Sequence, residues 1–179
     1  YGRYVMPAIP VLAVVGSGMA ASWLRPGAAE LLPRVTGRVW MAASALVLVI
    51  FWGIGLQRYF TDVRIIDSEM VATAQWVERE TPADALVAAH DIGALGYFGG
   101  RSLLDMAGLI SPDVVPFIRD EARLAAYIKA QGAAYLVTFP GWYPRIVARP
   151  EWQPVFSTGA PHAPAAGGEN MAVYVRVEP

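Results

Sequence analysis

Cysteine is absent from the 179 residues, and the chain has only two histidines. Without thiols it forms no disulfide and no cysteine-based zinc or redox site. His90 and His162 stand far apart in the sequence with no ligand-like spacing, so we expect no metal site. A formal net charge of −1 also gives no electrostatic basis for nucleic-acid binding. The sequence therefore predicts no metal, no other cofactor and no nucleic-acid partner.

Charge is scarce as well: 16% of the residues are charged, against about 25% in a typical soluble domain. Two long uncharged runs, about residues 4–24 and 39–57, are each long enough to cross a hydrocarbon core of about 30 Å. We therefore expect a region of two transmembrane helices over residues 1–59. Lipid and other transmembrane helices, from the same protein or from other subunits, are the expected partners of this region.

The loop between the two runs, residues 25–38, has three arginines and one glutamate. Because positively charged loops stay in the cytoplasm, the expected topology places this loop inside the cell and residues 60–179 outside the cytoplasm. Arginine supplies all but one of the basic residues, a bias typical of GC-rich bacterial genomes. We therefore expect a multi-pass protein of the bacterial inner membrane, with its C-terminal domain on the periplasmic or extracellular side.

The first uncharged run has two features beyond its length. Arg3 and Tyr4 open it at the expected outer surface, where an arginine either contacts a lipid phosphate or simply extends to the interface. Small residues recur along the run at helical spacing. They either let another helix pack closely or reflect the general abundance of small residues in membrane helices. The small residues of this candidate packing face are Gly16, Gly18, Ala20 and Ser22.

Residues 60–179 have a different pattern, in which short apolar runs alternate with helical periodicity. This alternation predicts a small α/β domain with a mixed sheet, whose central strands are parallel and whose edge is an antiparallel hairpin. We expect its first helix to begin at a capping residue, Asp67 or Ser68, and to end at Thr81 before Pro82. Further helices are expected at 92–98 and 120–131, and strands at 85–89, 102–105, 134–139, 152–158 and 171–177.

Polar residues follow two of the expected strands, in the segment AAHDIGALGYFGGRSLLDMAGLISP. His90 and Asp91 come after the first strand and Asp105 ends the second, at the edge where open α/β sheets place ligand groups. These three residues either form a ligand loop or fix the local backbone, as Asp91 would do by capping the next helix. The glycines of this segment do not fit the pattern G-x-G-x-x-G, and the chain has no G-x-S-x-G motif. A nucleotide site and a membrane-tethered hydrolase are therefore disfavoured.

Three stretches resemble bacterial membrane glycosyltransferases of family 39: YGRYVMPAIP, WVERETPADALVAAHDIGALGYFGGRSLLDMAGLISP and AYLVTFPGWYP. These enzymes have the multi-spanning GT-C architecture and are similar to protein O-mannosyltransferases and aminoarabinose transferases. The resemblance covers nearly the whole chain. It implies transfer of a sugar from a polyprenyl-phosphate donor to a lipid or protein acceptor outside the cytoplasm. It also suggests Arg3 and Tyr4 as contacts of the donor lipid.

Two functions follow from this resemblance. In the first, the chain is the C-terminal, non-catalytic portion of a polyprenyl-phosphate-sugar-dependent membrane glycosyltransferase, and its terminal domain shapes acceptor access. In the second, it is a glycosyltransferase-derived accessory subunit that stabilises a larger membrane complex, respiratory or photosynthetic, without catalysis of its own. The family's catalytic acid lies in its first extracytoplasmic loop. No residue of this chain matches that loop, so no catalytic residue is assigned. The aromatic turn FPGWYP is expected to pack against the domain, with sugar stacking or bilayer contact as alternatives.

Overall fold

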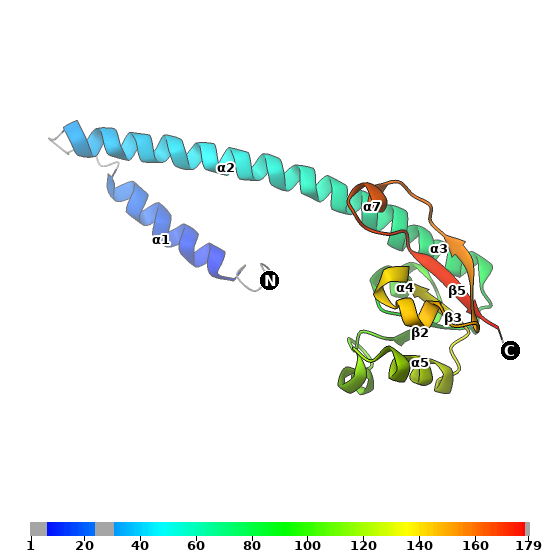
Figure 1. The fold of residues 1–179 in the computed structure, drawn as a ribbon. Helices are drawn as coiled ribbons and strands as arrows, with labels where there is room; N and C mark the ends of the chain where they lie inside the picture. The colour runs from blue at the N-terminus through cyan, green and yellow to red at the C-terminus, as the bar shows by residue number, and fades with distance from the viewer. Residues whose placement is uncertain (1–6, 24–30, 178–179) are drawn as a thin grey trace. The chain divides into compact units, whose positions relative to one another are not determined.

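Two apolar helices make up the first of the two units into which the chain divides, residues 1–58 and 59–179. The computed structural model describes residues 7–23 and 31–177, with side chains for 7–18 and 35–177. Helix α1 spans Ala8–Trp23, and helix α2 spans Leu31–Ile65 and continues into the second unit (Figure 1).

Within the described residues, one helical run is long and apolar enough to cross a membrane, and it extends from Val35 to Glu80. The most apolar part of this run is not buried within the protein. The described apolar stretch of α1, Ala8–Gly18, is shorter than a membrane span. The described residues thus contain one candidate membrane helix, which includes the run expected at about residues 39–57, and the first predicted span, at about residues 4–24, stays a prediction.

The long helix does not begin again at Asp67 or Ser68, so the expected helix start there is wrong. After α2 the chain makes a π-helical turn, η2, over Ile66–Val71 and continues as α3 over Ala72–Glu80. The hydroxyl of Ser68 donates to the backbone oxygen of Ile65 instead of capping a new helix. No proline occurs between Pro33 and Pro82, so nothing in the covalent structure interrupts the helix before its end.

A mixed five-stranded sheet forms the centre of the second unit, as the sequence predicted. The strand order is β2-β1-β3-β5-β4. β1 is parallel to both β2 and β3, whereas β5 is antiparallel to both β3 and β4. β4 is an edge strand whose pairing is irregular between Pro154 and Phe156. The strands are β1 Leu86–Ala89, β2 Ser102–Asp105, β3 Tyr135–Thr138, β4 Trp152–Ser157 and β5 Ala172–Arg176.

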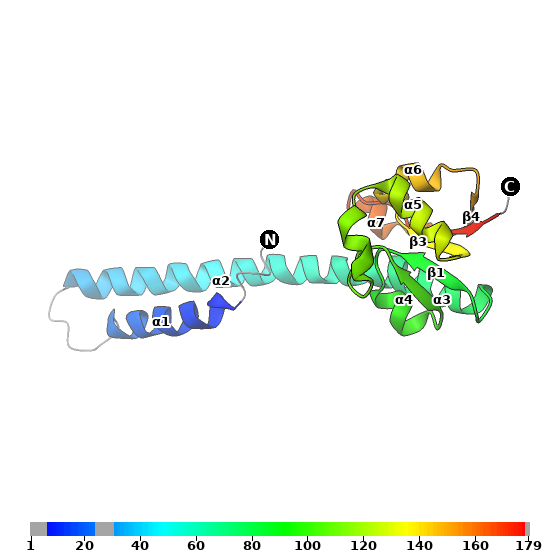
Figure 2. The ribbon, with the colours of Figure 1, turned by 90° about the horizontal axis from the view of Figure 1, so that it is seen from below.

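Helices cover both faces of the sheet (Figures 1 and 2). α3 and α4 (Gly93–Phe98) pack on one face, where Val87, Val137 and Val173 are buried with Ala74, Val77 and Leu95. η3 (Pro112–Phe117), α5 (Glu121–Ala130) and α6 (Pro144–Val147) pack on the other, around Leu104, Leu136, Leu124 and Ile128. Because both faces are buried, the central strands are apolar on both sides, which is why they appear in the sequence as short continuous apolar runs.

The strand order reverses at β1. The chain passes from β1 through α4 to β2 on one side, and then through α5 to β3 on the other side. Right-handed crossovers in opposite directions place α4 and α5 on opposite faces of the sheet. The carboxyl ends of β1 and β3 therefore flank a switch point, the place where open α/β sheets form their ligand crevice.

A buried carboxylate, that of Glu69, ties the helix to the antiparallel part of the sheet. Its Oε2 accepts hydrogen bonds from the backbone N–H of Met171 at 2.8 Å and from the hydroxyl of Thr158, and its Oε1 accepts from Nδ2 of Asn170 at 2.9 Å. Thr158 follows β4, and Asn170 and Met171 precede β5. The stacked rings of Trp76 and Phe156 add a second contact between α3 and β4.

Replacing Glu69 by glutamine tests this attachment. In glutamine one of the two carboxylate oxygens is replaced by an NH₂ group, which cannot accept a hydrogen bond. At least one of the buried donors around Glu69 therefore loses its acceptor. We expect E69Q to lower the free energy of unfolding by about 1–3 kcal/mol. The melting temperature of the detergent-solubilised chain, followed by tryptophan fluorescence, measures this change. The control is D67N, because Asp67 lies in the same π-helical turn with an exposed side chain. Equal melting of E69Q and D67N would contradict the assignment.

Candidate functional site

The candidate site lies at the edge of the sheet where the three parallel strands end. His90 follows β1 directly, Asp105 is the last residue of β2, and Phe139 follows β3. After Phe139 a short helix, η4, spans Pro140–Trp142 and leads to Tyr143. Segments far apart in the sequence thus meet at the switch point.

His90 and Tyr143 form the polar centre of this edge. Nδ1 of His90 lies 2.6 Å from the hydroxyl oxygen of Tyr143. The His90 ring also makes an edge-on contact with Trp142, with ring centroids 5.0 Å apart. When the tyrosine hydroxyl donates to Nδ1, the imidazole proton resides on Nε2, which then serves as a donor toward a ligand.

The electrostatic surroundings keep Tyr143 protonated. Burial raises its pKa to about 12, and the negative charges of Asp105 and Glu121 act in the same direction. A phenol with this pKa remains a hydrogen-bond donor throughout the physiological range. Tyr143 is therefore suited to orient His90 and not to act as a general base.

A hollow of about 430 Å³ opens beside this pair. Its volume falls within the range of about 300–1,000 Å³ that is usual for small-molecule sites. The half-exposed Trp142 supplies an aromatic wall, and Arg119 and Glu121 supply charge of both signs. Among the residues that the structure describes, the Arg119 side chain has no hydrogen-bond or ion-pair partner. The lining residues are His90, Ile118, Arg119, Glu121, Trp142 and Tyr143.

Glu121 has a structural partner as well. Its Oε2 accepts hydrogen bonds from the backbone N–H groups of Arg145 at 2.8 Å and Ile146 at 3.1 Å. These donors belong to the first turn of α6, and the N–H of Ile146 is shared with the backbone oxygen of Tyr143 at 3.0 Å. One carboxylate therefore positions α6 and the preceding Tyr143 at the wall of the hollow.

A second hollow, of about 480 Å³, is also lined by Trp142. Here Ile65, Phe139 and Trp142 face the chain around α7, which spans His162–Ala165. Within this hollow η4 is joined to the segment after α7, because the N–H of Gly141 donates to Oε2 of Glu169 at 2.6 Å. A Cβ at Gly141 would come within 3.0 Å of that carboxylate group, so a larger residue there would displace the end of the Glu169 side chain.

Asp105 shapes a loop instead of lining either hollow. Its buried carboxylate accepts hydrogen bonds from the backbone N–H groups of Ala107 and Ile110, each at 2.7 Å, and of Ser111 at 3.4 Å. Burial alone raises the pKa of Asp105, but hydrogen bonds from the backbone outweigh burial and hold its pKa below the ordinary value of 3.8. Of the two roles considered for Asp105, the structure supports local fixation of the backbone.

Asp91 also has a local role. Its Oδ1 accepts a hydrogen bond from the N–H of Gly93 at 3.3 Å. Gly93 is the first residue of α4 and Ile92 is its N-cap. Asp91, which was expected to be the N-cap, therefore lies one position before it and still binds the first N–H of the helix. Of the three predicted loop residues, His90 lines the first of these two hollows, and Asp91 and Asp105 line neither of the two. His162 begins α7 with an exposed side chain.

The candidate residues of the first predicted span are described in part. Arg3 and Tyr4 lie outside the described residues, as do the side chains of Ala20 and Ser22. Gly16 and Gly18 lie in α1, and no described atom is within 4 Å of a Cβ placed on either.

Two residues that make important contacts, Tyr143 and Glu69, were not predicted from the sequence. Tyr143 belongs to the aromatic turn after the third parallel strand, and the rule that parallel strands end at one edge would have placed it near His90. Glu69 shares a stripe with Thr73 and Val77 at a spacing of four residues, and all three are buried. An acidic residue on a buried stripe is the signal that would have marked it.

Removing the Tyr143 hydroxyl should change how stability depends on pH. Because the pKa is higher in the folded state, the unfolded chain loses this proton first, and stability declines as pH rises from about 10 to about 12. Y143F should lack this part of the decline and should lose the hydrogen bond to His90 at neutral pH. Melting temperatures between pH 7 and pH 12, with Y97F at the exposed Tyr97 as control, measure both effects. Parallel curves for the wild type and Y143F would contradict the assignment.

Asp105 predicts an effect of opposite sign at acid pH. Its lowered pKa stabilises the fold above the ordinary value of 3.8, and this stabilisation is lost as pH falls through the lowered value. D105N should lower the free energy of unfolding at pH 7 by about 1–3 kcal/mol, because an amide cannot accept all the N–H groups. The difference from wild type should shrink below pH 3.8. D113N, at an exposed aspartate of η3, should show neither effect.

Comparison with known proteins gives one result. No curated protein and no solved structure matches the chain. Among the described residues, no cluster of histidine, aspartate and glutamate is suited to hold a metal ion. Residues 68–174, from the π-helical turn to β5, match the family described as a domain of unknown function, DUF8728. This match covers more than half of the chain, which therefore belongs to the DUF8728 family.

Proposed function

We propose that the chain is the C-terminal, non-catalytic part of a polyprenyl-phosphate-sugar-dependent membrane glycosyltransferase. One observation carries the proposal. The stretches HDIGALGYFGG and FPGWYP, on which the resemblance to these enzymes rests, meet in the structure, where His90 contacts Trp142 and Tyr143 beside the hollow. In this proposal the chemistry takes place in a preceding part of the protein, and this domain shapes the access of the acceptor.

The chemistry of the hollow supports a sugar-bearing ligand. The exposed part of the Trp142 ring offers an apolar surface for the C–H face of a sugar. His90, Arg119 and Glu121 offer donors and an acceptor for hydroxyl groups at the same hollow. An aromatic wall with a few polar groups around it is the usual composition of a small-molecule site.

The membrane arrangement is part of the same proposal. In this proposal α2 anchors the chain in a bacterial inner membrane and α1 forms the other span. The arginine-rich segment 25–38 lies on the cytoplasmic side; it was expected to be a loop, but from Leu31 it belongs to α2. The α/β domain is then outside the cytoplasm, on the side where polyprenyl-linked sugars are transferred in the enzymes that the chain resembles.

A second candidate function is supported by α1. Gly16 and Gly18 leave open space beside the helix, and its valines and Leu12 are exposed. Small residues of this kind let a helix of another subunit approach closely. An accessory subunit of a larger membrane complex would use this surface for assembly and would have no transferase activity.

A transfer assay distinguishes the two functions. The chain, expressed with whatever sequence precedes it in its gene, is reconstituted in vesicles and given a radiolabelled polyprenyl-phosphate sugar and membrane acceptors. We expect transfer by the wild type. W142A should raise the KM for the acceptor several-fold with little change in kcat, because Trp142 contacts the acceptor and not the reacting atoms. Y97A, which removes an exposed aromatic ring outside the hollow, should behave as wild type. Wild-type protein that transfers no sugar and retains constant partner subunits through detergent washing would favour the accessory function.

A further inference from the structure

Three large apolar side chains project from the loop and short helix that follow β2. Leu109 is 74% exposed, Ile110 is 63% exposed and Val115, in η3, is 55% exposed. We call these three residues the apolar rim. Single exposed apolar residues are common on soluble proteins, but three from adjoining segments indicate a surface that is covered in the native setting.

The rim is held outward by a fixed backbone. The Asp105 carboxylate accepts hydrogen bonds from the N–H groups of Ala107, Ile110 and Ser111, and these three residues span the loop after β2. Gly108 adopts a φ of +75°, and a Cβ there would lie 2.7 Å from Cγ2 of Val115. The loop therefore packs closely on η3, and Leu109 and Ile110 are not free to fold back onto the domain.

The rim lies at the edge of the domain where α2 arrives. The last turns of α2, from Tyr59, belong to the second unit. Ile65 lines a hollow with Phe139 and Trp142, which follow β3. The rim follows β2, which is parallel to β1 and hence ends at the same edge as β3.

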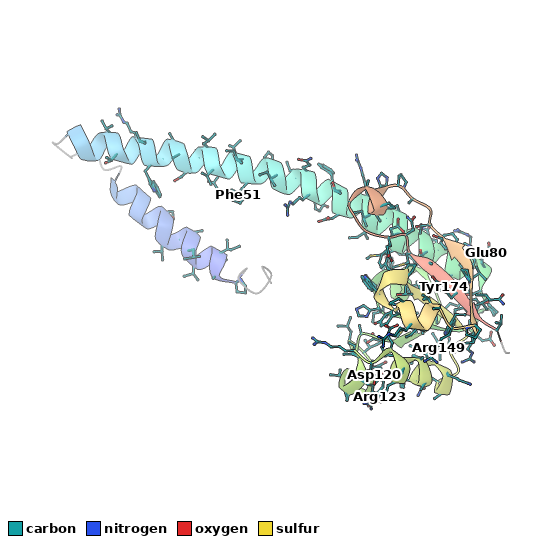
Figure 3. All side chains as sticks on the ribbon, viewed as in Figure 1. Phe51, Glu80, Asp120, Arg123, Arg149 and Tyr174 are labelled. Atoms are coloured by element: carbon teal, nitrogen blue, oxygen red, sulfur yellow. The ribbon has the colours of Figure 1, made fainter. Side chains whose placement is uncertain are left out.

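Aromatic and cationic side chains accompany the rim. Tyr59 and Phe60, in the last turns of α2, are more than half exposed and Trp142 is 48% exposed, as aromatic residues are at a membrane interface. Arg119 is exposed beyond η3, and Arg123 lies over the ring of Phe117 at 4.8 Å. Figure 3 shows Arg123 and Asp120 at the start of α5, where the Asp120 carboxylate binds the N–H groups of Ala122 and Arg123. These arginines are suited to bind lipid phosphate groups.

We propose that the apolar rim inserts into the headgroup–acyl boundary of the bilayer that α2 crosses, so that the site edge of the domain faces the membrane. Insertion of an apolar surface to a depth of about 5–10 Å is typical of interfacial segments. The inference rests on the membrane insertion of α2 in the proposed function but not on sugar transfer. It brings the hollow beside Trp142 to the level at which the headgroup of a lipid-linked molecule lies.

The absence of cysteine allows a direct test with the full chain. Single-cysteine variants L109C and I110C, labelled with a nitrobenzoxadiazole fluorophore, are reconstituted in phospholipid vesicles. Quenching by lipids with a nitroxide near the headgroup is compared with quenching by aqueous iodide. F51C reports the insertion of α2, on which Phe51 is exposed (Figure 3). Y97C is the matched control, because Tyr97 is 83% exposed near the end of α4, which returns the chain to the opposite edge of the sheet.

We expect nitroxide lipids to quench L109C, I110C and F51C several-fold more than Y97C, and iodide to quench mainly Y97C. Quenching of both rim labels by iodide, with F51C quenched by lipid, would overturn the inference and leave the membrane anchor intact. Rim labels shielded from both quenchers would also overturn it, because protein and not lipid would then cover the rim. F51C without lipid quenching would overturn the anchor and the inference together. The melting temperature of each labelled variant checks that the domain remains folded.

Discussion

The hydrogen bonds to the Glu69 carboxylate are the constraint on which the domain's arrangement depends. A charge without solvent is costly to bury, and this one is tolerated because a hydroxyl, an amide and a backbone N–H surround it. Those donors flank the long connection between β4 and β5. A single side chain thus joins the helix that enters the domain to the two strands that complete the sheet. The π-helical turn around it changes the helical register just where that contact is made.

Three other carboxylates fix the backbone around the candidate site by accepting hydrogen bonds from N–H groups. Asp105 fixes the loop after β2, Glu121 holds the start of α6, and Glu169 binds Gly141. Each of them accepts hydrogen bonds from backbone N–H groups in a loop or in the first turn of a short helix. The edge of the sheet is therefore built from loops with little freedom, and His90, Trp142 and Tyr143 are presented on a fixed frame. Such preorganisation is what recognition of a small polar ligand requires.

The fold of residues 59–177 was largely predictable, because its signals are local. Short apolar runs gave the strands within one or two residues, and Asp120 caps α5 as the pattern of that helix suggests. The start of the first helix was not predictable from Asp67 or Ser68. Capping residues permit a helix to begin, but without a preceding proline or glycine they do not stop one that is already under way.

The site was predictable only in outline. Strand ends pointed to His90 and Asp105, yet their different roles depend on which groups come within hydrogen-bond distance. The partner of His90 lies 53 positions away, and the donors to Glu69 lie still further along the chain. Contacts between distant segments depend on how the layers pack, and one sequence carries no direct signal for them. The strand-end rule and the buried stripe could have marked Tyr143 and Glu69 as positions, but their hydrogen-bond partners emerged only from the structure.

The two edges of the sheet determine how copies of the protein behave when they are crowded together. β2 ends the sheet on one side with only four residues. β4 ends it on the other with Pro154, which has no N–H to donate, beside an irregularity that breaks the ladder. Neither edge offers a long, regular template for a strand from a neighbouring copy. A domain with such edges is thereby protected against joining neighbouring copies into extended sheets, even at high local concentration.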